Sequence, residues 1–134
     1  MALLSDTISS NKYLSTFSKS LISASLNNEL SADGPYTVFA PSELAFSKLF
    51  NGELPELMQP DHKEQLRNML RCHIVDGLHP FSSLTNGKKL VSVNGRILEI
   101  GINNGYVYVN GAAIQEKDNL NSNGILHSVG SLIA

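Results

Sequence analysis

The stretch from Tyr36 to Leu49 constrains the fold more than any other part of the chain. Its first residues, 37–39, are β-branched and aromatic, which is typical of a short buried strand. Pro41 has no N–H to donate, so we expect it to end that strand. Ser42 suits the N-cap of a helix, and Glu43 places a negative charge in its first turn. The stretch therefore predicts a buried strand that leads directly into an amphipathic helix.

The remainder of the first half predicts further helices. Residues 3–9 suit a short helix, and Asn11 suits the N-cap of a longer one. The longer helix has an apolar face formed by Leu14, Phe17, Leu21 and Ile22. Asp61 and Glu64 form a capping-box pattern ahead of another helix. The inward face of that helix comprises Leu66, Met69 and Leu70.

From His73 onward the chain has the character of strands separated by tight turns. Asn-Gly pairs, which favour hairpin turns, begin at residues 86, 94, 104, 110 and 123. The predicted strands between them are 90–93, 96–102, 106–109 and 112–117. We expect a mostly antiparallel meander with one buried face. Helices in the first half and strands in the second indicate an α+β fold.

Composition indicates one globular domain that comprises residues 1–134 and is 42% hydrophobic. A net charge of −2 provides no basic stripe for nucleic acid. No apolar run approaches the roughly 18 residues of a spanning helix, so we expect no membrane insertion by this domain. The single cysteine, Cys72, cannot form an internal disulfide, so packing must stabilise the fold.

Motifs of common enzymes do not occur in this sequence. It has no Walker loop and no Gly-x-Gly-x-x-Gly, His-Glu-x-x-His, Cys-x-x-Cys or Gly-x-Ser-x-Gly pattern. We therefore expect no catalytic residue and no cofactor. Cys72, His73 and His79 are close enough in sequence to suggest zinc. Because adjacent residues of a strand face opposite sides, Cys72 and His73 are poor joint ligands, and we expect no metal site.

Two histidines have strongly apolar surroundings. His127 lies within Ile125-Leu126-His127-Ser128-Val129, and His73 precedes Ile74-Val75. We predict that His127 is a buried imidazole that donates to a backbone carbonyl. We expect a similar environment for His73.

Three segments in the same order resemble those of fasciclin-type (FAS1) domains. They are Thr37-Val38-Phe39-Ala40-Pro41-Ser42 with Ala45-Phe46, then Leu70 to Gly77, then Asn123-Gly124 through His127 to Val129 with Leu132-Ile133. The resemblance implies a β-wedge of two sheets, with several α-helices packed mainly from the N-terminal half. The strands at Thr37 and Ile125 would both be central to that wedge.

The resemblance also implies a non-enzymatic module that is extracellular, periplasmic or on a cell surface. Such a module would mediate adhesion or attachment to protein or glycan. The alternative is a carrier of a small apolar or pigment-like ligand, which would need a well-formed apolar cavity. No Asn-x-Ser/Thr sequon occurs, which favours a bacterial source. Residues 1–4 lack the basic region of a signal peptide, so we expect a trimmed or mature domain.

The sequence departs from the family pattern in several places. The central segment of many relatives carries Tyr-His, implicated in integrin-mediated adhesion, but Cys72 replaces that Tyr and only His73 carries over. Asp118 matches the family, whereas Asn119 stands where an apolar residue is usual and Gly130 where Asp is frequent. Integrin binding of the animal type is therefore not expected.

A partner should contact exposed loops, since the two outer boxes of the resemblance should be buried. We expect the contact at segments 77–85 and 118–121. The candidate interaction residues are His73, His79, Phe81 and Asp118, with Phe81 as the anchor. Each of three has a structural alternative: His73 as a core imidazole, Asp118 as a turn residue, and Phe81 as a ring packed against the sheet.

Overall fold

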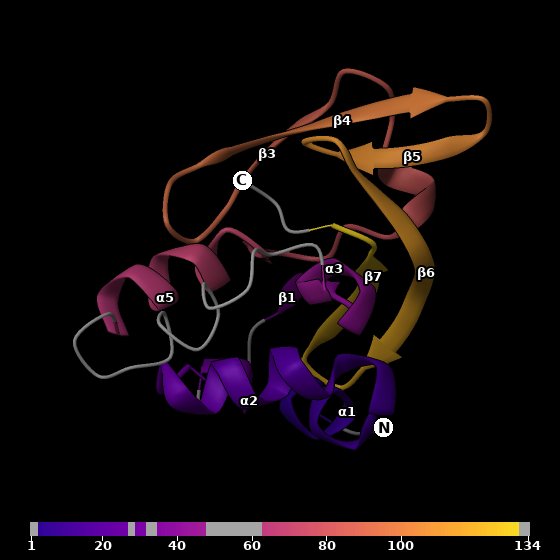
Figure 1. Cartoon of the computed structure of the whole chain (residues 1–134). Coiled ribbons are helices and arrows are strands. Elements are labelled where there is room, and N and C mark those ends of the chain that lie inside the picture. The colour runs from indigo at the N-terminus through magenta and orange to yellow at the C-terminus, as the bar shows by residue number, and fades with distance from the viewer. Residues whose placement is uncertain (1–2, 27–28, 32–34, 48–62, 132–134) are drawn as a thin grey trace.

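The computed structural model describes residues 3–26, 29–31, 35–47 and 63–131 (Figure 1). Its helices are α1 (Leu4–Ser10), α2 (Ser15–Ser23), α3 (Glu43–Ser47) and α5 (Lys63–Arg71), with 3₁₀ turns η1 (Lys12–Leu14), η2 (Glu29–Ser31) and η4 (Phe81–Ser83). Its strands are β1 (Tyr36–Pro41), β2 (Ile74–Asp76), β3 (Lys89–Val91), β4 (Ile97–Asn103), β5 (Tyr106–Val109), β6 (Ala112–Asn121) and β7 (Gly124–Val129). The hydrogen-bonded order of the strands is β2-β1-β7-β6-β5-β4-β3.

The helices of the first half form close to where the sequence predicts them. Asn11 Oδ1 accepts a hydrogen bond of 2.9 Å from the backbone N–H of Tyr13, which confirms Asn11 as a cap. Ile22, predicted on the apolar face of α2, is 59% exposed, so that prediction is wrong. Ile22 follows Phe17 by five residues, about 140° around the helix. Ser20, about 60° from Phe17 around the helix, is buried on the Phe17 side instead. Its hydroxyl donates to Thr16 O at 2.8 Å.

The predicted strand-to-helix junction is present at β1 and α3. The prediction that Pro41 ends the strand is confirmed: Pro41 is the last residue of β1 and pairs with Val129. The backbone N–H that follows, on Ser42, donates to Val129 O at 3.1 Å, so the missing N–H of Pro41 costs the ladder little. Helix α3 begins at Glu43, directly after Ser42. Leu49 and Asp61 lie outside the described residues.

Strands β1 and β7 are parallel neighbours inside the sheet, second and third of the seven strands in the strand order. Tyr36 pairs with Gly124, and the register continues to Pro41 opposite Val129. Strand β2 lies antiparallel on the other side of β1, and β6 lies antiparallel on the other side of β7. The central position predicted for both strands is confirmed. Strand β6 continues to Asn121, beyond its predicted end at 117.

The meander from β3 to β7 is antiparallel throughout. Asn104-Gly105 and Asn110-Gly111 have φ of 53° and 82° and of 48° and 86°, so both pairs form the left-handed two-residue turns expected of hairpins. Residues Ser122 and Asn123 make the last turn, and Gly124 already belongs to β7. The Asn123-Gly124 pair therefore has a role other than a hairpin tip.

The strands separate two apolar clusters. Val38 of β1, Ile74 of β2 and Leu126 of β7 pack with the helices. Phe39, Val75 and Val129, from the opposite faces of the same strands, pack with residues of β3 to β6. Val93 N donates to Ile74 O at 2.9 Å, and Val75 bridges Ser92, so the two ends of the strand order meet. In Figure 1, β3 to β5 lie at one end of the molecule and α1 and α2 at the other, which confirms the α+β wedge.

The two outer boxes of the resemblance supply this centre. Their buried residues include Thr37, Val38, Phe39, Ala40, Pro41, Ser42, Phe46, Asn123, Gly124 and His127. Asn123 Oδ1 accepts from Leu4 N at 2.9 Å, and Asn123 Nδ2 donates to Leu30 O at 2.7 Å. The carbonyl of Asn123 accepts from Tyr36 N at 3.0 Å. One asparagine thus links α1, η2 and β1.

Gly124 is required by the close approach of β1. A Cβ atom at this position would lie 2.0 Å from Tyr36 O and 2.8 Å from Leu4 Cδ1. We predict that Gly124→Ala destabilises the fold by about 3 kcal/mol, because backbone atoms would have to move apart. Denaturant unfolding measures this change. Gly101→Ala in β4 is the matched control, since a Cβ atom there would meet nothing within 4 Å; equal losses in both variants would contradict the prediction.

Candidate functional site

The loop of residues 77–85 meets the second half of strand β6, although the two segments are distant in sequence. Phe81 N donates to Asp118 Oδ1 at 2.9 Å. Lys117 Nζ lies 4.0 Å from the centroid of the Phe81 ring, a cation–π arrangement. We call the surface formed by residues 77–85 and 117–121 the Phe81 surface. The structure thus brings together His79, Phe81 and Asp118, three of the predicted interaction residues; their role in binding stays a prediction.

An irregularity in β6 directs Asp118 toward this surface. The pairing of β6 with β7 shifts by one residue between Glu116 and Asn119, and Asp118 has φ of 56°. Its backbone N–H donates to His127 Nδ1 at 3.2 Å, while its carboxylate accepts from Phe81 N. Such a one-residue shift is a β-bulge, and β-bulges commonly change the direction of a side chain near a functional site.

His127 lies beneath the Phe81 surface and is fully buried. Its Nε2 donates to His79 O at 3.0 Å, and its Nδ1 accepts from Asp118 N, which fixes the tautomer. The ring stacks on Phe39 with 5.5 Å between centroids. The predicted buried, hydrogen-bonded imidazole is confirmed. Burial lowers the pKa of His127, so the ring stays neutral at physiological pH.

His73 is not at the surface. Its side chain is fully buried, with Nδ1 2.9 Å from Met69 O and the ring 6.3 Å from that of Phe17. The prediction of His73 as an interaction residue is therefore wrong, because the apolar residues beside it draw it into the helical core. Its alternative role as a core imidazole is confirmed. Burial lowers the pKa of His73 to about 4.

Loop 77–85 is held to the sheet by Thr37. The Thr37 hydroxyl donates to Gly77 O at 2.8 Å and accepts from His79 N at 2.9 Å. His79 Nε2 lies 3.1 Å from Asp76 O. These bonds fix the backbone of the loop at its first residues.

The three residues that suggested zinc have separate partners. Cys72 is buried, and its Sγ accepts a hydrogen bond from Asn94 Nδ2 at 2.9 Å. The rings of His73 and His79 lie against two different backbone carbonyls, those of Met69 and Asp76. Within the described ranges, no three His, Cys, Asp or Glu side chains are placed to share a metal ion.

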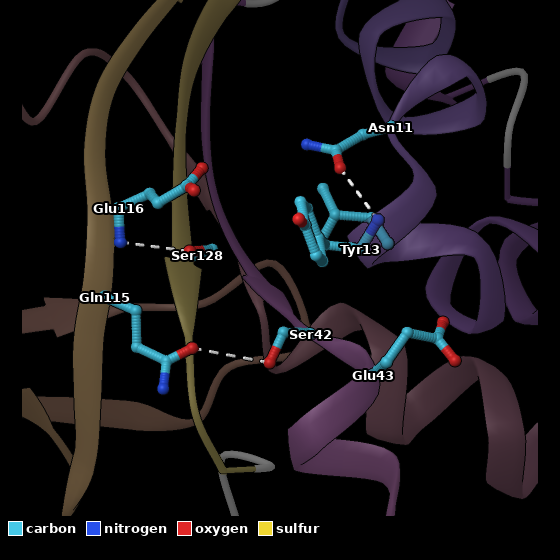
Figure 2. A pocket seen from close by; sticks show the side chains of 8 residues that line it. Asn11, Tyr13, Ser42, Glu43, Gln115, Glu116 and Ser128 are labelled. Atoms are coloured by element: carbon cyan, nitrogen blue, oxygen red, sulfur yellow. Dashed lines mark hydrogen bonds between the residues drawn. The ribbon is translucent and has the colours of Figure 1, made fainter.

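A second candidate site is a cleft of about 270 Å³ between the helical layer and β6 and β7 (Figure 2). It is lined by Asn11, Tyr13, Leu14, Ser42, Glu43, Gln115, Glu116 and Ser128. We call it the Tyr13 cleft. Sequence reasoning missed it, because its walls come from segments about a hundred residues apart. The available signal was Tyr13, an aromatic residue two positions after the capping Asn11.

Another one-residue shift in β6 shapes this cleft. Ile114 pairs with Val129 and Glu116 with Ser128, so Gln115 is the extra residue. Neighbouring strand residues normally face opposite sides, but Gln115 and Glu116 both line the cleft. The backbone of Glu116 is fixed by a 3.0 Å hydrogen bond to Ser128 Oγ. The amide of Gln115 accepts from Ser42 Oγ at 3.5 Å.

Glu43 joins the cleft wall to α2. Its Oε1 accepts from Ser15 Oγ at 2.9 Å and from Thr16 N at 2.6 Å, and its Oε2 accepts from Thr16 Oγ1 at 2.8 Å. Burial alone would raise the pKa of this carboxyl, but the hydrogen bonds from Thr16 and Ser15, with Lys19 nearby, together lower it. Glu43 is thus an anion that caps the first turn of α2.

Residues 12–134 match the Fasciclin domain family. The chain belongs to that family. It is 34% identical to protein sll1483 of the cyanobacterium Synechocystis, over 92% of this chain and 68% of that protein. It is 29% identical to transforming growth factor-beta-induced protein ig-h3 of Sus scrofa and 29% identical to human periostin, over 99% and 97% of this chain. These matches span only 19% and 15% of the two animal proteins.

The fold is that of fasciclin domains. The structure superposes on a FAS1 domain pair from the insect cell adhesion molecule Fasciclin I with a TM-score of 0.88 and 15% identity. The match covers 99% of this chain and 51% of that one. None of the helices described here is long and apolar enough to cross a membrane.

We predict that His127→Ala destabilises the domain by about 1–3 kcal/mol, because the N–H of Asp118 and the carbonyl of His79 lose their partner. Urea unfolding at pH 7 measures the loss. His79→Ala serves as the control, since its half-exposed ring lies against the carbonyl of Asp76, only three residues away. A loss no larger than that of the control would refute the role given to His127.

We predict that His73 makes the domain less stable as the pH falls from 6.5 toward 4. Over this range the unfolded chain binds a proton that the native state excludes, because the native pKa is about 4. The difference between 6.5 and about 4 corresponds to a loss of about 3 kcal/mol at pH 4, as an upper bound. Unfolding free energies at pH 7, 5.5 and 4 should fall less steeply in His73→Gln than in the wild type. Equal slopes would contradict the prediction.

Proposed function

We propose that this fasciclin domain is a non-enzymatic interaction module outside the cytoplasm, in the extracellular space, the periplasm or on a cell surface. It mediates adhesion or attachment to protein or glycan. Family membership supports the proposal, as does the likeness to a domain pair from an insect cell adhesion molecule. The observation that carries it is the Phe81 surface, where an aromatic ring is presented from a fixed loop.

The Phe81 surface combines rigidity with exposed apolar groups. Thr37 fixes one end of loop 77–85, and Asp118 fixes Phe81. Leu78 and Leu120, one from each segment, are 56% and 60% exposed. A surface that is already ordered loses little conformational entropy on binding, which favours affinity.

Phe81 has the features of an anchor residue. Phe81 is half-buried, since it packs against the second apolar cluster, to which Val75 and Leu84 belong. Lys117 lies over the ring and adds a positive charge beside it. Aromatic residues with a fixed orientation are common among the few residues that dominate binding energies. Part of the Phe81 ring therefore packs against the sheet, while the rest is accessible to a partner.

Several side chains support a non-enzymatic role. His73 and His127 are buried and bonded to backbone groups, and Cys72 is buried. Glu43 caps a helix with a lowered pKa, which does not suit a general acid. A nucleophile needs a base within hydrogen-bond reach and access to a substrate, and His73, His127 and Cys72 lack that access because they are buried.

A carrier of apolar ligands is not proposed. Six of the eight residues that line the Tyr13 cleft have polar side chains, although apolar atoms contribute more of its surface. A carrier of a pigment-like ligand requires a large, enclosing cavity, and the volume of about 270 Å³ lies below the usual range for such ligands. The Tyr13 cleft therefore suits a smaller ligand.

The proposal is tested by attachment of the domain to panels of matrix proteins, glycans and cells. We predict that Phe81→Ala reduces attachment at least about tenfold, because an anchor residue contributes about 2 kcal/mol or more and a tenfold change needs about 1.4 kcal/mol. Tyr106→Ala, an exposed tyrosine at the β4–β5 hairpin, is the matched control and should attach as the wild type does.

The stability of the folded variants distinguishes an anchor residue from a core residue. Phe39→Ala removes a fully buried ring and should cost about 3–5 kcal/mol. If Phe81→Ala unfolds the domain as severely as Phe39→Ala, Phe81 is a core residue and the Phe81 surface is wrong. If the Phe81→Ala variant is folded and attaches as the wild type does, the proposed binding role of the Phe81 surface is also rejected.

A further inference from the structure

We propose that the Tyr13 cleft binds one neutral sugar residue of a glycan. The ring of Tyr13 would pack against the C–H face of the sugar, and Asn11, Gln115 and Glu116 would bond its hydroxyls. The inference rests on the proposed attachment function, but it concerns residues separate from the Phe81 surface.

The composition of the cleft matches the chemistry of a sugar. A pyranose has hydroxyls that both donate and accept, and C–H faces that pack on aromatic rings. Tyr13 is 59% exposed, so its ring is accessible to a ligand. The amides of Asn11 and Gln115 donate and accept, and the carboxylate of Glu116 accepts. A volume of about 270 Å³ lies just below the range of pockets for drug-sized ligands, so it suits one small ring.

The side chains of the cleft are directed toward a common space. Asn11 Oδ1 is held by the N–H of Tyr13, which leaves the amide nitrogen of Asn11 directed toward β6 (Figure 2). Glu116 points its carboxylate toward Asn11 from the opposite wall (Figure 2). Lys12 Nζ lies 5.2 Å from the centroid of the Tyr13 ring, over one face, so a ligand would use the other face.

The wall formed by β6 depends on two local features. The extra residue at Gln115 allows Gln115 and Glu116 to line the same cleft. Gly130 provides the space for Gln115, since a Cβ atom there would lie 2.6 Å from Gln115 Nε2.

The charges favour a neutral ligand over a basic peptide. Both oxygens of Glu43 are engaged by Ser15 and Thr16, so Glu43 offers little to a cation. Lys12 already places a positive charge at the Tyr13 ring. Among the residues that line the cleft, Glu116 alone presents an exposed carboxylate. The cleft offers one carboxylate that accepts and two amides that both donate and accept. This mixture suits hydroxyls, which donate and accept, better than a guanidinium, which only donates.

The test is an NMR titration of the 134-residue chain with methyl glucoside, methyl galactoside and N-acetylglucosamine. A ligand of this size that makes a few hydrogen bonds should bind with a Kd of about 1–10 mM. The amide signals of Tyr13, Gln115 and Glu116 should shift with at least one of these sugars. Tyr13→Ala should weaken binding at least about tenfold, and Tyr106→Ala should not change it.

Gly130→Ala provides a second variant outside the ligand contacts. The added methyl group would displace Gln115 and weaken the same sugar severalfold, while the folded state is verified from the rest of the spectrum. Because Tyr13 is exposed, Tyr13→Ala should keep the wild-type melting temperature.

Three outcomes would overturn the proposal. They are the absence of shifts in the cleft with any of the sugars up to roughly 50 mM, shifts with N-acetyl-arginine amide instead of a sugar, and equal losses in Tyr13→Ala and Tyr106→Ala. Phe81→Ala must leave sugar binding unchanged. If attachment depends on Phe81 while no sugar binds, only this inference fails; if attachment fails with every partner, the proposed function fails as well.

Discussion

The parallel pairing of β1 with β7 is the interaction on which the rest of the structure depends. It joins residues almost ninety positions apart, from Tyr36 opposite Gly124 to Pro41 opposite Val129. Because side chains alternate along a strand, this pair supplies Val38 and Leu126 to the helical core and Phe39 to the other core. Asn123 and Gly124 set its register, one by hydrogen bonds to Leu4 and Leu30, the other by allowing the backbone of Tyr36 to approach. Neither core can form without this pairing.

The buried histidines extend this centre to the surface without carrying charge. His127 stacks on Phe39 and bonds to the backbones of His79 and Asp118, so the core directly supports the loops of the Phe81 surface. His73 connects the end of α5 to the helical core through Met69 O. Burial lowers the pKa of both rings, which keeps them neutral while they bond to backbone groups. Two histidines that suggest catalysis in the sequence thus act as structural links between elements.

Sequence reasoning succeeded where a residue type has a local physical requirement. The strand at residues 37–39, the cap at Asn11 and the turn at Asn104 follow from β-branching, capping and left-handed backbone conformations. It failed where tertiary contacts decide the outcome. Ile22 is apolar yet exposed, and His73 is polar yet buried, since their neighbours in space are fixed by the whole fold. Phe81 and Asp118 were each predicted at a surface, but their contact depends on an extra residue in β6 that no sequence periodicity reveals.

Strand β6 accounts for both candidate sites. It pairs with β7 through two one-residue shifts, at Gln115 and between Glu116 and Asn119. The first shift turns Gln115 and Glu116 into the Tyr13 cleft, and the second turns Asp118 toward Phe81. Its partner β7 is buried along its whole length and is fixed on its other side by β1. A regular strand, β7, next to an irregular one, β6, allows the surface to vary while the pairing of β1 with β7 stays intact. Substitutions that alter binding should therefore concentrate in β6 and the loops that contact it, whereas β1 and β7 should tolerate few.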